Sequence, residues 1–189
     1  MSAIDAVVIG CSAGGLEALQ QVLRLFPAGL GVPVVIVSHT APDGIYLLPQ
    51  LLGRICALPV AEAEEGEPVL AGHVYLASPN YHLLIEPDRR FALSTDPKVC
   101  NVRPAIDVLF VSAADAFRGR LAGIVLTGAN ADGARGLRAV AEAGGFGLVQ
   151  DPLTAFADAM PRAAIASVPT AKVLPLPAIA GEVIALCRP

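Results

Sequence analysis

The stretch AVVIGCSAGGLEAL, residues 6–19, decides the fold of this 189-residue chain. Its first part, AVVIG, is a short apolar run rich in β-branched residues, which predicts a buried strand. Glycines and Ser12 follow, and from Leu16 onward apolar residues recur at helical spacing. A strand, a glycine-rich turn and a helix together predict the first βα unit of an α/β protein.

The rest of the chain repeats this alternation. Strands are expected at 32–38, 121–128, 145–150 and 171–176, and helices at 16–26, 45–55, 104–118, 134–143, 161–166 and 178–186. Residues 57–94 differ, because turn residues separate short apolar runs in a manner typical of antiparallel strands. We predict one domain over residues 1–189, a doubly wound, mainly parallel α/β sheet with helices on both faces and a small antiparallel excursion near 57–94.

The composition excludes several classes of protein. Hydrophobic residues make up 54% of the chain and charged residues 16%, which argues against disorder. The net charge of −4 and the lack of basic runs give no support to nucleic-acid binding. No apolar run reaches the roughly 18–20 residues of a membrane-spanning helix, so we expect no membrane insertion. The four cysteines lack CxxC spacing, which argues against a zinc site and fits thiols in a reducing cytoplasm.

Polar residues follow three of the expected strands. Ser12 follows AVVIG, His39 follows VPVVIVS, and Asp132 lies just after LAGIVLTG. Because parallel strands end at the same edge of a sheet, these side chains are expected to meet, as a Ser-His-Asp triad requires. GCSAG also fits the G-x-S-x-G nucleophile turn. The order Ser, His, Asp disfavours a usual α/β-hydrolase and leaves open a triad on another sheet.

Structural roles compete with the catalytic ones. Ser12 and Asp132 could cap helices, and His39 could bond to backbone at a strand end. Cys11 is an alternative nucleophile, and His73 and His82 are alternative bases. A dinucleotide site fits poorly, because Ser12 replaces the second glycine of G-x-G-x-x-G and the acidic residue expected after the second strand is absent.

Six segments in collinear order resemble the catalytic domain of the chemotaxis protein-glutamate methylesterases, the CheB family. They are VVIGCSAGGLEAL, VVIVSHTAPDG, GHVYLASPNYHLLIE, NVRPAIDVLFVSAA, GIVLTGANADGARGL and LVQDPLTAFADAMPRAAI. The resemblance implies a doubly wound parallel sheet that carries a Ser-His-Asp triad.

The resemblance also implies roles for individual residues. Ser12 would be the nucleophile, His39 the base and Asp132 the residue that orients the imidazole. The backbone N–H groups of Ala129 and Ala13 would bind the oxyanion. Substrate contacts are expected from Arg103, His82 and Met160, with bracing of the fold as an equal alternative for Arg103. No metal or cofactor is implied.

The implied reaction is hydrolysis of glutamyl γ-methyl esters on chemoreceptor signalling helices in the cytoplasm, with release of methanol and, in addition, deamidation of glutamine. No receiver domain fits before the first strand, so we expect a stand-alone esterase, either constitutively active or controlled by a response regulator in trans. Ala13, Thr40 and the GANAD loop (128–132) depart from the family pattern and leave the oxyanion loop and substrate preference open. Two alternatives remain, an esterase for a different methyl ester and a catalytically silent binding module.

Overall fold

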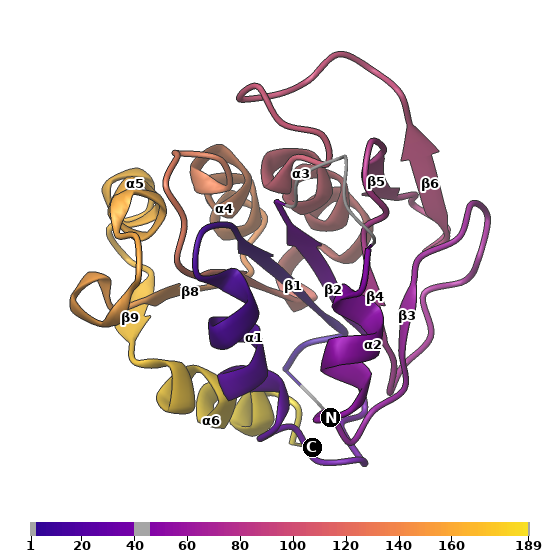
Figure 1. Cartoon of the computed structure of the whole chain (residues 1–189), viewed down its shortest axis with the longest axis horizontal. Helices are drawn as coiled ribbons and strands as arrows, with labels where there is room; N and C mark the ends of the chain where they lie inside the picture. The colour runs from indigo at the N-terminus through magenta and orange to yellow at the C-terminus, as the bar shows by residue number, and fades with distance from the viewer. Residues whose placement is uncertain (1–2, 40–45, 189) are drawn as a thin grey trace.

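The computed structural model describes residues 3–39 and 46–188 of the chain (Figure 1). Seven parallel strands form the main sheet in the order β3-β4-β2-β1-β7-β8-β9. The strands are β1 (Ala6–Cys11), β2 (Val34–Ser38), β3 (Val60–Glu62), β4 (Val74–Leu76), β7 (Leu121–Val125), β8 (Phe146–Gln150) and β9 (Lys172–Leu174). The predicted doubly wound parallel sheet is confirmed.

Helices cover both faces of this sheet. One face carries α1 (Gly15–Leu23), α2 (Leu48–Gly53) and α6 (Leu176–Leu186), and the other carries α3 (Ile106–Phe117), α4 (Ala134–Glu142) and α5 (Ala159–Ser167). Two short 3₁₀ helices, η1 (Arg118–Arg120) and η2 (Pro152–Thr154), lie in the connections. Side chains alternate between the two cores along each strand, as in β1, where Val7 and Ile9 face one core and Ala6 and Val8 the other.

The antiparallel excursion is present but shorter than expected. Only β5 (His82–Ile85) and β6 (Phe91–Ser94) pair antiparallel, while β3 and β4 join the main sheet in parallel. Val74–Leu76 is buried on both faces, which is typical of an inner parallel strand. The helix expected at 45–55 is described over Leu48–Gly53, and residue 45 lies outside the described residues.

The strand order reverses at β1. From β1 the chain builds outward through β2 on one side, and it later returns to place β7 on the other side. Ligands of open α/β sheets bind beyond the carboxyl ends of the strands at such a reversal. The three residues predicted to meet follow β1, β2 and β7, the strands at this point.

Two glycines let α3 approach the sheet closely. A Cβ atom on Gly10 in β1 would lie 2.3 Å from Cγ2 of Ile106, and one on Gly133 would lie 2.9 Å from the same atom. The first residue of α3 therefore occupies space that two side chains would otherwise fill. In the part of the chain that the structure describes, every helix is too short or too polar to span a bilayer.

Candidate active site

Strand pairing brings Ser12 and His39 to the same edge of the sheet. Cys11 of β1 pairs with Ser38 of β2, so the next residue on each strand leaves the sheet at the same level. The backbone N–H of His39 donates to the Cys11 carbonyl at 3.1 Å, and that of Ser12 donates to the carbonyl of Thr127, beyond β7, at 2.9 Å. The turn that holds Ser12 is thus fixed to both neighbouring strands.

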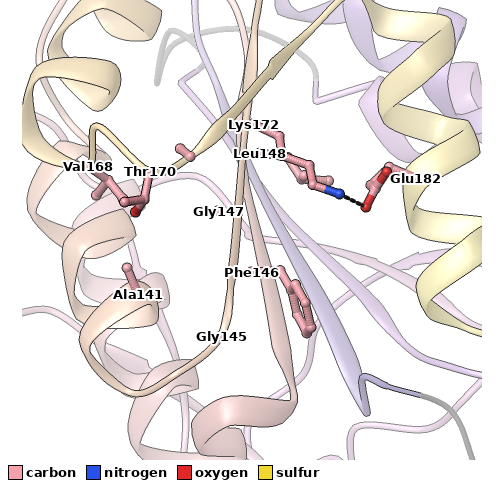
Figure 2. Close-up of a pocket in the computed structure, with 10 residues that line it drawn as sticks. Ala141, Gly145, Phe146, Gly147, Leu148, Val168, Thr170, Lys172 and Glu182 are labelled. Atoms are coloured by element: carbon pink, nitrogen blue, oxygen red, sulfur yellow. Dashed lines mark hydrogen bonds and ion pairs between the residues drawn. The ribbon is translucent and has the colours of Figure 1, made fainter.

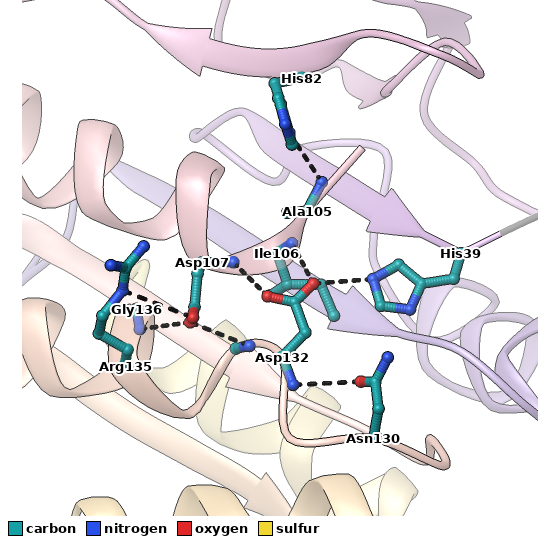
Figure 3. A network of polar contacts seen from close by, with 10 residues as sticks. His39, His82, Ala105, Ile106, Asp107, Asn130, Asp132, Arg135 and Gly136 are labelled. Atoms are coloured by element: carbon teal, nitrogen blue, oxygen red, sulfur yellow. Dashed lines mark hydrogen bonds and ion pairs between the residues drawn. The ribbon is translucent and has the colours of Figure 1, made fainter. Parts of the chain in front are cut away.

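His39 and Asp132 form a direct side-chain contact. His39 Nε2 lies 2.8 Å from Asp132 Oδ2, and the two side chains are 10% and 0% exposed (Figure 3). Asp132 Oδ2 also accepts the N–H of Ile106 at 2.6 Å, and Oδ1 accepts that of Asp107 at 3.0 Å. The carboxylate therefore sits at the N-terminus of α3, where a negative charge is stabilised.

This contact decides which nitrogen of His39 is free. An ionised carboxylate only accepts hydrogen bonds, so Nε2 must carry the proton that it donates to Asp132. In the neutral imidazole Nδ1 then has a lone pair. Nδ1 is buried and has no hydrogen-bond partner within the described residues. His39 thus offers a proton acceptor beyond the end of β2, and within the described residues this acceptor forms no hydrogen bond to Ser12.

The competing structural roles of the three residues are not those observed. The N-cap of α1 is Gly14, in a left-handed conformation (φ 77°) and without a side-chain cap, so Ser12 does not cap the helix. The N-cap of α4 is Gly133, so Asp132 does not cap its own helix either. His39 bonds through its side chain to a carboxylate rather than to backbone.

Cys11 is unsuited to act as a nucleophile. Its side chain is fully buried, and burial raises the pKa of its thiol to about 12. Because the thiolate is the reactive form, this cysteine is inert at neutral pH. Ser12, the next residue, is partly exposed.

Two backbone N–H groups remain available near Ser12. Those of Ala13 and Ala129 have no hydrogen-bond acceptor in the described ranges, 3–39 and 46–188. The loop that presents Ala129 is closed by Asn130, whose Oδ1 accepts the N–H of Asp132 at 3.1 Å. Asn130 is not among the residues with positive φ, so its side chain holds the loop by this hydrogen bond without a left-handed backbone.

A polar cleft of about 110 Å³ adjoins His39. Its other lining residues are Asn80, Lys98, Asn101, Val102, Arg103 and Pro104. Nη1 of Arg103 donates to the carbonyls of Thr95 and Asp96 at 2.6 and 2.9 Å, while its Nε is buried without a partner in the described residues. Arg103 thus both braces the loop and gives the cleft positive charge.

His82 and Met160, which are expected to contact the substrate, are not among the described residues that line the cleft next to His39. His82 is 1% exposed, its Nδ1 accepts the N–H of Ala105 at 3.1 Å, and its Nε2 donates to the Pro97 carbonyl at 3.1 Å. Both ring nitrogens are occupied, and the residue holds the start of α3 (Figure 3). Met160 is fully buried beneath Gly128, whose carbonyl accepts its N–H at 2.9 Å.

Three supporting residues were missed by the sequence analysis. Asp107 accepts the N–H groups of Gly133 and Gly136 at 3.0 and 2.7 Å, and burial raises the pKa of its carboxyl. Thr127 contacts the Ala13 carbonyl through Oγ1 at 2.8 Å, and its own N–H donates to Gln150 Oε1 at 2.9 Å. In the sequence these are polar residues at the start of a helix or the end of a strand. Ordinary helix capping explains such residues equally well, so their position alone does not reveal a supporting role.

Two other features do not form a reactive site. Ligand atoms of Cys100, Asp107 and Asp132 lie within 4.8 Å of one another, but N–H donors already bind both carboxylates. A hollow of about 180 Å³ lies where β8 and β9 begin (Figure 2). Ser12 instead follows the end of β1, a strand parallel to these two. Its only charged lining residues, Lys172 and Glu182, are paired with each other.

Both the sequence and the fold of this chain match one known family. The family model described as CheB methylesterase matches residues 7–183. The chain belongs to the CheB methylesterase family. The crystal structure of the Thermotoga maritima CheB methylesterase catalytic domain superimposes with a TM-score of 0.92 and 33% sequence identity, over 97% of this chain and 98% of that one.

Curated relatives of this CheB-family chain include proteins of two lengths. A Leptospira interrogans protein is 46% identical over 178 residues, which cover 93% of this chain and 91% of the relative; it is named, provisionally, protein-glutamate methylesterase/protein-glutamine glutaminase. A Symbiobacterium thermophilum protein with the same name, given without reservation, is 40% identical over 177 residues. That match covers 94% of this chain, but this chain corresponds to only 49% of the length of the relative.

Proposed function

We propose that this protein is a serine esterase that hydrolyses glutamyl γ-methyl esters on chemoreceptor helices in the cytoplasm. The 2.8 Å contact between His39 and Asp132, next to the turn that holds Ser12, carries the proposal. The names of the relatives, which pair methylesterase with glutaminase activity, support the choice of substrate.

Ser12 is the nucleophile of the proposed reaction. Its Oγ attacks the ester carbonyl carbon while its proton passes to Nδ1 of His39, and the carbonyl π electrons move to oxygen. Asp132 stabilises the imidazolium through Nε2. When the tetrahedral intermediate collapses, the bond to the methoxy oxygen breaks, and His39 returns the proton to give methanol.

Water completes the cycle. It attacks the acyl-enzyme carbonyl as His39 takes its proton, and Ser12 leaves with that proton to release a free glutamate side chain. The N–H groups of Ala13 and Ala129 donate to the oxyanion in both halves of the reaction. Among residues 3–39 and 46–188 these two N–H groups find no other acceptor, which supports this role.

The cleft that Arg103 and Lys98 line is the proposed contact for the substrate's acidic surroundings. Positive charge beside the ester favours a segment that also carries free carboxylates. Glutamine deamidation is the second proposed activity, because the same acyl-enzyme forms when ammonia replaces methanol as the leaving group. The joint name of the relatives favours it.

The test is methanol release from a methylated chemoreceptor cytoplasmic fragment. Wild type should release methanol, and Ser12→Ala and His39→Ala should lose at least 10³-fold in kcat. Ser167→Ala and His73→Ala are matched controls, because these residues contact Arg138 and the Ala71 carbonyl away from the site. The controls should retain wild-type rates.

A reactive-serine probe separates the alternatives when the folded wild type releases no methanol. Labelling that Ser12→Ala abolishes would indicate an esterase for a different ester. Absence of labelling would indicate a catalytically silent module and would reject the proposed function.

A further inference from the structure

The two most exposed large apolar side chains lie together in one turn. Leu153 is 88% and Phe156 83% exposed, whereas the other exposed large apolar residues of the described chain reach at most 49%. We call residues Leu153 to Phe156 the apolar turn. It follows β8 and includes the end of η2. Exposure of this degree is unfavourable in water and marks contact surfaces.

The apolar turn adjoins the turn that holds Ser12. Gly14 has no side chain, and a Cβ atom there would lie 2.5 Å from Cβ of Phe156. The next residue, Ala157, accepts the N–H of Gly128 at 3.0 Å and donates to Thr127 Oγ1 at 2.9 Å. The exposed side chains therefore belong to the same edge of the sheet as the nucleophile.

Hydrogen bonds fix the backbone of the apolar turn. Asp151 Oδ1 accepts the N–H of Leu153 at 3.0 Å, and Gln150 Nε2 donates to the Thr154 carbonyl at 3.2 Å. Gln150 is itself buried, at 1% exposure. A partner that binds here meets a backbone that is already ordered, so binding carries little entropic cost for this loop.

The other flank of the site has the opposite chemistry. The cleft next to His39 is polar and carries Lys98 and Arg103, and neither forms an ion pair within residues 3–39 and 46–188. In the sheet, β2, which precedes His39, and β8, which precedes the apolar turn, lie on opposite sides of β1, which ends just before Ser12. This arrangement matches a segment with apolar side chains on one side of its ester and carboxylates on the other.

We propose that the apolar turn is the docking surface for the receptor helix that carries the methylated glutamate. Leu153 and Phe156 contact an apolar side chain of that helix adjacent to the ester, while its free carboxylates face the Lys98 and Arg103 cleft. The inference rests on the proposed function. It adds to that function the surface of the protein that recognises the substrate helix.

Binding in a Ser12→Ala background tests this proposal, because the ester then survives the measurement. The probe is a fluorescently labelled, methylated chemoreceptor cytoplasmic fragment, followed by anisotropy. Adding Leu153→Ser should raise Kd at least tenfold, or about 1.4 kcal/mol, and Phe156→Ser should act in the same direction. Leu25→Ser is the matched control, because Leu25 is 43% exposed and lies beyond α1 at the other end of the sheet. It should leave Kd unchanged.

Three outcomes would overturn the proposal. They are a Kd for Leu153→Ser within twofold of the parent, no measurable binding by the Ser12→Ala parent, and a wild-type dimer that Leu153→Ser converts to monomers, which would assign the surface to a second copy of the chain. Failure of the proposed function has a different sign: the native protein would release no methanol from the methylated fragment.

Discussion

The N-termini of α3 and α4 are built alike but carry different chemistry. At α3 the carboxylate of Asp132 accepts the N–H groups of Ile106 and Asp107. At α4 the carboxylate of Asp107 accepts those of Gly133 and Gly136. Each helix thus receives its anion from a residue at the start of the other, and both side chains are nearly or fully buried. The two sites satisfy the same electrostatic demand.

The difference lies in the remaining partner of each carboxylate. Asp132 contacts the imidazole of His39, whereas Asp107 faces Arg135, whose Nε lies 3.6 Å away and whose side chain is 66% exposed. Burial and helix capping are therefore shared and do not distinguish the aspartate proposed to act in catalysis from the structural one. The partner that can exchange a proton does.

The largest expected effect comes from Asp132→Asn. One amide group cannot accept from Ile106, Asp107 and His39 together, because its NH₂ end must face one of these donors. The imidazole loses the charge that stabilises imidazolium, and it also loses its fixed tautomer when the NH₂ group faces Nε2. We expect kcat to fall about 10³–10⁴-fold, measured as methanol release from the receptor fragment. A loss of less than tenfold in a folded variant would contradict the role of Asp132.

Asp107→Ala should have a smaller effect, and on stability first. It leaves the N–H groups of Gly133 and Gly136 without their acceptor, which should lower the free energy of unfolding by about 1–2 kcal/mol. Because Gly133 follows Asp132, kcat should also fall, by roughly tenfold, since a misplacement of about 1 Å costs up to 10²-fold. Urea unfolding and methanol release measure the two effects. A loss of kcat equal to that of Asp132→Asn would remove the distinction between the two aspartates.

The smallest effect concerns pH. Burial raises the pKa of Asp107, so the folded protein holds this proton more tightly than the unfolded chain does. Its contribution to stability is complete below the unfolded pKa of about 4 and is lost as pH rises through the folded pKa. Asp107→Asn keeps an oxygen for Gly133 and Gly136 but does not titrate. Its stability relative to wild type should therefore increase from pH 4 to pH 7 in urea unfolding, and a constant difference would contradict this.

Sequence patterns predicted the sheet because burial imposes them. Strands such as β1 and β2 are covered on both faces, so they must be continuous apolar runs. Short inner strands are harder to recognise: Val74–Leu76 lies among turn residues, and only its burial between β2 and β3 reveals a parallel strand. A three-residue run has no periodicity from which direction could be inferred.

Strand ends also predicted that Ser12, His39 and Asp132 gather at one edge. The sequence could not predict what surrounds them. His82 was expected near the substrate, yet its two nitrogens bind backbone groups of residues 97 and 105, which are far from it along the chain. Asp107 was overlooked because an acidic residue in a first helical turn is commonplace. Its partners, Gly133 and Gly136, come from a different helix.

The position of the Asp132 carboxylate depends on the absence of a side chain at Gly10. Gly10 has a hydrogen atom where any other residue has a Cβ, and the side chain of Ile106 occupies that space. The N–H of Ile106 is one of the three donors to Asp132. A single methyl group at position 10, one residue before the end of β1, would lift the first turn of α3 away from the sheet, and the carboxylate would move with it. The alignment of the imidazole is thus set by a residue that touches neither the histidine nor the ester.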